Sequence, residues 1–139
     1  MFPKLTRVLI VDDSTVARHI VRDLFDQLGF TNLSEAPDGA KAYDLLCTRL
    51  KEGQPIELVI SDWNMPILDG IGLLKKIRSS ADFKPLPLLM LTSNDETHLM
   101  MEAIEAKVDH YLVKPPTLES LRKKLEIIWK KYHPSETPS

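Results

Sequence analysis

The chain has 139 residues, a formal net charge of -2 and 27% charged residues, which fits one domain with one core and gives no electrostatic basis for nucleic-acid binding. No apolar run reaches the roughly 20 residues that a membrane helix needs, and residues 1–4 do not open a secretory signal. Cys47 is the single cysteine and cannot form an internal disulfide, so we expect it to be a buried small apolar side chain in a cytoplasmic protein.

Short apolar segments alternate along the chain with stretches in which apolar residues recur at helical spacing. The predicted strands span residues 8–11, 33–36, 58–60, 88–91 and 111–113. The predicted helices span residues 16–28, 43–50, 71–77, 95–106 and 118–132. Residues 133–139 contain two prolines and small polar side chains, which predicts a flexible tail after a core at about residues 5–132.

This alternation of strands and helices predicts an α/β fold with a doubly wound parallel sheet. The first, third and fourth strands are continuously apolar, which indicates that helices cover both faces of the sheet. In such folds, ligands bind at the carboxyl ends of the strands.

Polar residues follow four of the five predicted strands. Asp12 and Asp13 follow the first, Asp62 the third, Thr92 the fourth and Lys114 the fifth. The carboxylates should therefore meet at one edge of the sheet, and two carboxylates about 4 Å apart repel by roughly 4 kcal/mol at an effective dielectric of 20. A hard divalent cation relieves this repulsion, and oxygen ligands without Cys or His favour Mg²⁺ over zinc.

Each of these residues also has an ordinary structural role. Asp12 or Asp13 can cap the following helix in competition with Ser14, Thr92 can cap the fourth helix, and Lys114 can be a solvated cation. Such roles do not explain why acids, a hydroxyl and a base occupy successive strand ends, so we interpret the set as a functional site.

The combination of motifs resembles the bacterial response-regulator receiver family over residues 5–132. The motifs are Val11-Asp12-Asp13, Asp62, Met65-Pro66, Asp69-Gly70, Thr92 and Lys114-Pro115. Residues 60–66, 22–24 and 28–32 are similar to chemotaxis members of that family, which bind the flagellar motor switch. The resemblance implies a flavodoxin-like fold of five parallel strands in the order 2-1-3-4-5, and one receiver domain over residues 1–139.

The resemblance also implies the chemistry of the site. Asp62 would accept a phosphoryl group from a histidine kinase. Asp12, Asp13, Asp62 and the backbone carbonyl of Asn64 would hold Mg²⁺, with Asp12 acting largely through water. Lys114 would contact a phosphoryl oxygen, in a signalling protein that catalyses only its own phosphorylation and dephosphorylation.

Thr92 and Tyr111 would form the switch, since Thr92 would bond the phosphoryl group and Tyr111 would change rotamer with it. The family's output surface corresponds here to Met100, Ile104, Tyr111, Val113, Thr117 and Lys124. We expect Met100 to point outward and Met101 inward, and Trp63 to be partly exposed beside the site. The implied partners of this monomer are the kinase and an output protein such as the flagellar motor switch, with no nucleic acid or membrane.

Some positions depart from the family pattern, and other functions remain open. Lys107 stands where many receivers carry Gly, and Pro116 replaces a familiar Phe. A phosphorelay intermediate or phosphate sink would use the same chemistry. An Asp-nucleophile phosphohydrolase would need an Asp-x-Asp motif and cap elements, and a flavin carrier would need a Gly-rich phosphate loop where Asp12 and Asp13 stand.

Overall fold

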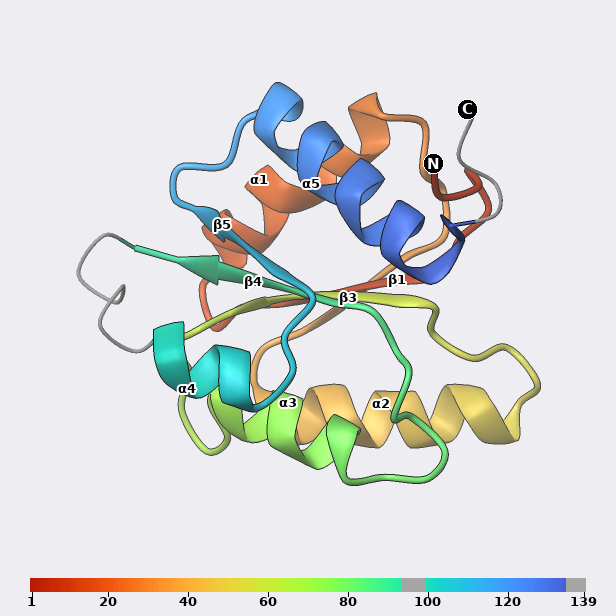
Figure 1. The fold of residues 1–139 in the computed structure, drawn as a ribbon, viewed down its shortest axis with the longest axis vertical. Coiled ribbons are helices and arrows are strands. Elements are labelled where there is room, and N and C mark those ends of the chain that lie inside the picture. Colours follow the sequence, from red (N-terminus) through yellow and green to blue (C-terminus); the bar gives the residue numbers. More distant parts are fainter. Residues whose placement is uncertain (94–99, 135–139) are drawn as a thin grey trace.

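The structure, a computed structural model, describes residues 1–93 and 100–134. Five parallel strands form one sheet in the order β2-β1-β3-β4-β5, and each strand is followed by a helix (Figure 1). The strands are β1 Val8–Val11, β2 Leu33–Ala36, β3 Leu58–Asp62, β4 Leu88–Thr92 and β5 His110–Val113. The helices are α1 Thr15–Gln27, α2 Gly39–Lys51, α3 Gly70–Arg78, α4 Met100–Glu105 and α5 Leu118–Tyr132. The predicted fold class and strand order are confirmed.

Helices cover both faces of the sheet: α1 and α5 lie on one face, and α2, α3 and α4 on the other (Figure 1). Side chains of β1 alternate between the two cores, since Val8 and Ile10 pack with α1 and α5, whereas Leu9 and Val11 pack with α2 and α3. Strands β1, β3 and β4 are buried over their whole length, as expected of central parallel strands.

Two predicted segments lie partly outside the described residues. The fourth helix was predicted over residues 95–106, and its described part is Met100–Glu105. Of the predicted tail, residues 135–139 are not described. The other predicted elements are found, most of them with different ends. The largest difference is in α2, which begins at Gly39, four residues before its first predicted residue, because hydrogen bonding and capping carry a helix beyond its apolar pattern.

The predicted orientation of Met100 and Met101 is wrong. Met101 is 66% exposed, whereas Met100 packs against the core between α4 and the sheet. Ala103 is fully buried and marks the inward face of α4. Met100 lies three residues before Ala103 and shares that face, while Met101 shares the outer face with Ile104.

Trp63 and Cys47 also differ from expectation. Trp63 is 2% exposed and belongs to the same core as Val59, because side-chain alternation continues one residue past β3. Cys47 is only partly buried against that core. In α1 the apolar pattern extends beyond the buried face, since Val16 and Ile20 are exposed and Val21 is buried.

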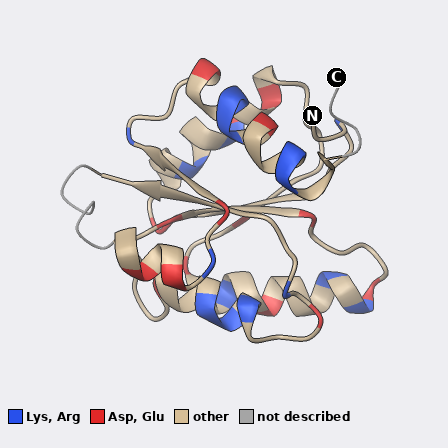
Figure 2. Ribbon diagram, viewed as in Figure 1, with Lys and Arg blue, Asp and Glu red and all other residues tan. Residues whose placement is uncertain are grey.

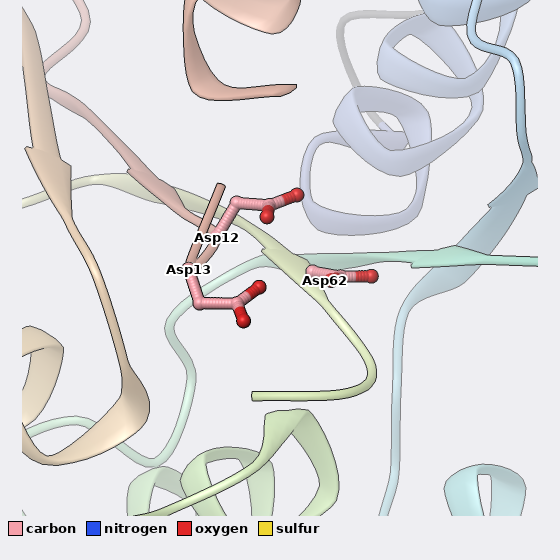
Figure 3. A group of neighbouring side chains, drawn as sticks. All are labelled: Asp12, Asp13 and Asp62. Carbon is pink, nitrogen blue, oxygen red and sulfur yellow. The ribbon is translucent and has the colours of Figure 1, made fainter. Parts of the chain in front are cut away.

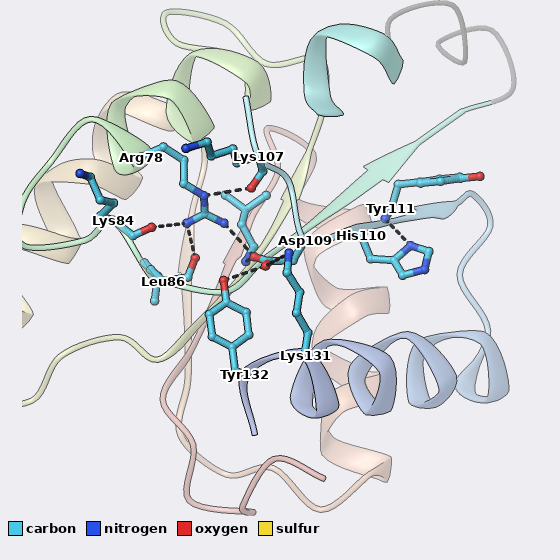
Figure 4. Close-up of polar contacts among 10 residues, drawn as sticks. Arg78, Lys84, Leu86, Lys107, Asp109, His110, Tyr111, Lys131 and Tyr132 are labelled. Carbon is cyan, nitrogen blue, oxygen red and sulfur yellow. Dashed lines mark hydrogen bonds and ion pairs between the residues drawn. The ribbon is translucent and has the colours of Figure 1, made fainter. Parts of the chain in front are cut away.

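Asp109 organises a buried polar cluster at the end of the sheet opposite the carboxyl edge (Figure 4). Its side chain is 1% exposed. One oxygen accepts hydrogen bonds from Arg78 of α3 at 2.8 Å and from the backbone N–H of Leu88 at 2.7 Å. The other accepts from Lys131 at 2.9 Å and from the Tyr132 hydroxyl at 2.7 Å, both on α5. The cluster therefore ties both helical layers to the sheet.

Arg78 extends this cluster into the neighbouring loops. Helix α3 ends in basic residues (Figure 2), and the Arg78 guanidinium donates to the carbonyls of Lys84, Leu86 and Lys107. Lys107 has a φ of 66°, in the left-handed region that usually favours glycine, so the departure from the family pattern expected at this position places a lysine in that conformation. Burial and the Asp109 carboxylate raise the pKa of Tyr132 well above its ordinary value.

We predict that Asp109→Ala lowers the free energy of unfolding by about 3–5 kcal/mol, because it leaves buried cationic and N–H donors without an acceptor. Tyr132→Phe removes one hydrogen bond to the same carboxylate and should cost about 1.5 kcal/mol. Urea denaturation of both variants measures the difference. Equal losses would contradict a central role for Asp109.

Candidate functional site

The sheet brings the polar residues at the strand ends to one edge. Asp12 follows β1 directly, Asp62 ends β3, Thr92 ends β4 and Lys114 follows β5. The pairing register aligns these ends, since Asp62 pairs with Leu91 in β4. Four of the predicted positions therefore lie at neighbouring strand ends.

Three carboxylates form the centre of this edge (Figure 3). Asp12, Asp13 and Asp62 each present an oxygen, and these oxygens lie within 4.8 Å of one another. Asp12 is 2% exposed and Asp62 is 6% exposed, whereas Asp13 is exposed. The site, called the acidic pocket below, is thus a cluster of negative charge in which two carboxylates are buried and the third is exposed to solvent.

Ser14, and not either acid, caps α1. The Ser14 hydroxyl accepts a hydrogen bond from the N–H of Ala17, so capping does not account for Asp12 or Asp13. The Ser14 N–H in turn donates to Asp12 Oδ1 at 2.9 Å, which fixes the Asp12 side chain. Within the described part of the chain, the Asp13 side chain makes no hydrogen bond or ion pair.

The Asp12 carboxylate is incompletely satisfied by the protein. Its Oδ2 is buried, with no hydrogen-bond partner among the described residues. Burial raises the pKa of Asp12, and the charges of Asp62 and Asp13 raise it further, while the Ser14 N–H and Lys114 oppose the shift. A buried oxygen without a donor, beside two more carboxylates, has the chemistry of a ligand for a hard cation.

These residues therefore fit Mg²⁺, which prefers oxygen ligands and retains several waters. Asn64 lies two residues after Asp62 on the exposed loop between β3 and α3. The part played by its backbone carbonyl as a ligand stays a prediction.

Asp62 is held through one of its two oxygens. Lys114 Nζ lies 2.7 Å from Asp62 Oδ1, and the backbone N–H of Trp63 donates to the same oxygen at 2.8 Å. Among the described residues, Oδ2 has no hydrogen-bond donor. The side chain is thus fixed by one oxygen while the other remains available. The Lys114–Pro115 peptide bond is cis.

Thr92 ends β4, and Tyr111 lies on the adjacent strand β5, where it pairs with Met90, two residues before Thr92. Thr92 is fully buried, and its hydroxyl donates to the carbonyl of Ser93 at 3.0 Å. Tyr111 is half-buried on β5, with the Lys124 ammonium 5.1 Å from its ring centre. Lys124 also lies 3.4 Å from His110 Nδ1, and burial together with Lys124 lowers the pKa of His110.

The predicted output residues lie on α4, β5 and α5, around the β5 edge of the sheet (Figure 1). Ile104 is 59% exposed, whereas Met100, Val113 and Lys124 are only partly exposed. Thr117 is the exposed N-cap of α5. Ile127 of α5 is 49% exposed and adds an apolar side chain to this surface.

Two further residues shape the site: Gly70, which sequence reasoning placed only in a motif without a role, and Arg18, which sequence reasoning missed. Gly70 begins α3 so close to β3 that a Cβ there would lie 2.4 Å from the Asp62 carbonyl oxygen, so glycine is required by close approach. Arg18 of α1 donates to the backbone carbonyl of Asp12 at 2.6 Å. The only sequence signal for Arg18 is a weak one: it lies four residues before Arg22, which places both side chains on the same face of the helix.

The fold and these side chains are those of a two-component signalling receiver, and residues 8–126 match the response regulator receiver domain, so the chain belongs to that family. Phosphorylation and Mg²⁺ binding are features of the family, whose members are signalling proteins and not enzymes acting on separate substrates. This membership argues against the phosphohydrolase and flavin-carrier alternatives.

Chemotaxis proteins are among the most similar relatives. Chemotaxis protein CheY-3 of Vibrio cholerae is 42% identical over 92% of this chain and 95% of its own length. Chemotaxis protein CheY of Pseudomonas aeruginosa is 38% identical over 90% and 97%. The structure of chemotaxis response regulator CheY4 of Vibrio cholerae superposes with a TM-score of 0.74 at 30% identity, over 89% of this chain and 98% of that one.

No helix in the described ranges, 1–93 and 100–134, is both long enough and apolar enough to cross a membrane.

The acidic pocket makes a prediction about stability and metal. Burial raises the folded-state pKa of Asp12 above its ordinary value of 3.8, so the ionised carboxylate destabilises the metal-free fold at pH 7. This penalty disappears as the pH falls through the folded-state pKa. In EDTA at pH 7, Asp12→Asn should therefore raise the midpoint of thermal unfolding.

Mg²⁺ should reverse that ranking. At one hundred times its Kd, Mg²⁺ should stabilise the wild type by about 2.7 kcal/mol, and Asp12→Asn by clearly less. Asp13→Asn is the matched control, because Asp13 is exposed and its charge contributes least to the raised pKa of Asp12: it should reduce the Mg²⁺ gain while stabilising the metal-free protein less than Asp12→Asn does. A wild type that Mg²⁺ leaves unchanged would contradict the metal assignment.

Proposed function

We propose that the chain is a stand-alone receiver in which Asp62 accepts a phosphoryl group from a histidine kinase, and that phosphorylation switches the α4–β5–α5 surface to control a partner in chemotaxis. The observation that carries this proposal is the state of Asp62. One oxygen is held by Lys114 and the Trp63 N–H, the other has no hydrogen-bond donor among the described residues, and two further carboxylates lie beside it.

This arrangement suits phosphoryl transfer from a phosphohistidine. The Asp62 oxygen that has no donor among the described residues forms a bond to phosphorus, and the phosphorus–nitrogen bond breaks. The imidazole leaves with that electron pair and takes up a proton from water, which makes it neutral. Lys114 lies 2.7 Å from the acceptor and can neutralise charge on the incoming oxygens. Asp12, Asp13, Asp62 and the Asn64 carbonyl are the residues that would hold Mg²⁺, which offsets the remaining negative charge when bound.

A shallow hollow beside the pocket supports the approach of such a donor. It has a volume of about 330 Å³. It is lined by Asp12, Ala17, Ile20, Val21, Leu91, Lys114, Pro115 and Pro116. Most of this lining is apolar, so a neutral ring can pack there while its phosphoryl group faces the charged residues.

The buried hydroxyl of Thr92 supports a switch. It now donates to a neutral carbonyl, that of Ser93, and a phosphoryl oxygen on Asp62 would be a stronger, charged acceptor. A change in this hydrogen bond, on the strand that pairs with β5, would favour one of two arrangements of the β5 edge, as in a population shift. Ile104 and Ile127, both exposed on this side, would then contact the output partner.

The chemotaxis role is supported by relatives that are named as chemotaxis proteins. These relatives are matched over 95% and 97% of their own length, so the receiver domain makes up almost all of each of them. A phosphorelay intermediate or phosphate sink would share the pocket. A pull-down with the beryllofluoride-bound chain separates the roles, since the motor switch protein should be retained in the first case and a histidine phosphotransfer protein in the second.

Intact-mass spectrometry after incubation with acetyl phosphate tests the acceptor. We expect a phosphoryl adduct on the wild type that requires Mg²⁺, and none on Asp62→Asn, which keeps the shape of the side chain but lacks the nucleophilic oxygen pair. An adduct that persists on Asp62→Asn would show that another residue accepts the phosphoryl group.

A further inference from the structure

We propose that Arg18 is a positioning residue that orients the peptide between Asp12 and Asp13 for Mg²⁺ binding. The inference rests on the proposed function, because it concerns the same acidic pocket. Arg18 lies on the first turn of α1, and its side chain is 15% exposed. Its contacts within the described part of the chain include none of the three carboxylates. It acts on the backbone that carries two of them.

The Asp12 backbone is held on both sides. Its N–H donates to the carbonyl of Ala36 in β2 at 3.1 Å, and its carbonyl accepts from Arg18 Nη1 at 2.6 Å. That carbonyl belongs to the planar peptide unit that ends at the Cα atom of Asp13. Holding this carbonyl in place therefore fixes the direction in which the Asp13 side chain leaves the backbone.

Asp13 needs this support more than its neighbours do. Asp12 is held by the Ser14 N–H and Asp62 by Lys114 and the Trp63 N–H. The side chain of Asp13 has no such contact within the described residues and is exposed. The direction of the Asp13 side chain toward the other carboxylates therefore depends on the backbone, and Arg18 is the side chain that holds this backbone.

Arg18 is itself fixed by its neighbours. Its Nε lies 3.1 Å from Glu35 Oε1, and its Nη2 donates to the Thr15 hydroxyl at 3.3 Å. The guanidinium group thus joins α1, β2 and the loop that carries Asp12 and Asp13, called the acidic loop here. An ammonium group cannot reproduce this geometry. Arg22 pairs with the other oxygen of Glu35 at 2.9 Å but makes no contact with the acidic loop among the described residues.

Arg22 therefore provides a matched control, and the sign of the effect separates two explanations. A cation near the pocket repels Mg²⁺, so removing the charge alone would tighten Mg²⁺ binding slightly. Removing a positioning residue would weaken it, and outer contacts of metal ligands typically contribute 10–100-fold in affinity.

Isothermal calorimetry with MgCl₂ tests the proposal on the full chain. We expect Arg18→Ala to raise the Kd for Mg²⁺ at least tenfold and Arg22→Ala to change it by less than twofold. Glu35→Gln should give an intermediate increase, because it loosens Arg18 without removing it. Arg18→Lys should recover only part of the affinity. Thermal unfolding in EDTA measures any general loss of stability separately.

The possible outcomes distinguish the proposal from the function on which it rests. If the wild type bound no Mg²⁺, or Asp13→Asn bound it equally well, the proposed function would fail. If the wild type bound Mg²⁺ and Arg18→Ala bound it as tightly or more tightly, Arg18 would have no positioning role. If Arg18→Ala did not fold, the comparison of Arg18→Lys and Glu35→Gln with Arg22→Ala would decide in the same way.

Discussion

The crowding of three carboxylates at one edge of the sheet is the constraint on which the rest of the site depends. Two of them, Asp12 and Asp62, are almost completely buried, where charge repulsion is strong and hydration is lost. The protein compensates only in part, with Lys114 and the Trp63 N–H on Asp62 and the Ser14 N–H on Asp12. The negative charge that remains uncompensated suits the pocket to a divalent cation, and the bound cation then suits it to a phosphoryl group.

Asp109 at the opposite end of the sheet shows what a fully compensated buried acid looks like. It receives four donors, from Arg78, the Leu88 N–H, Lys131 and Tyr132, whereas Asp12 Oδ2 receives none among the described residues. Both acids are buried in the same fold. Their hydrogen bonding separates a structural carboxylate, which binds elements together, from one whose partner is expected to come from solution.

The strands and the candidate pocket could be predicted from the sequence because both follow from local pattern. Apolar runs identified the strands, and parallel topology then placed Asp12, Asp62, Thr92 and Lys114 at one edge. Contacts between distant segments could not be predicted in this way. The Asp109 cluster joins residues more than twenty positions apart, and the burial of Met100 depends on how α4 sits against the sheet. Trp63 was predictable in principle, had strand alternation been extended past Asp62.

The central claim is that a cation compensates the acidic pocket and thereby admits an anionic phosphoryl group. The most direct test measures the coupling between Mg²⁺ and beryllofluoride, a phosphoryl mimic, by calorimetry with each ligand titrated in the presence and absence of the other. We expect no beryllofluoride binding in EDTA, and a Kd for Mg²⁺ at least tenfold lower once beryllofluoride is present, since coupling between two ligands is reciprocal. Equal beryllofluoride binding with and without Mg²⁺ would contradict the account.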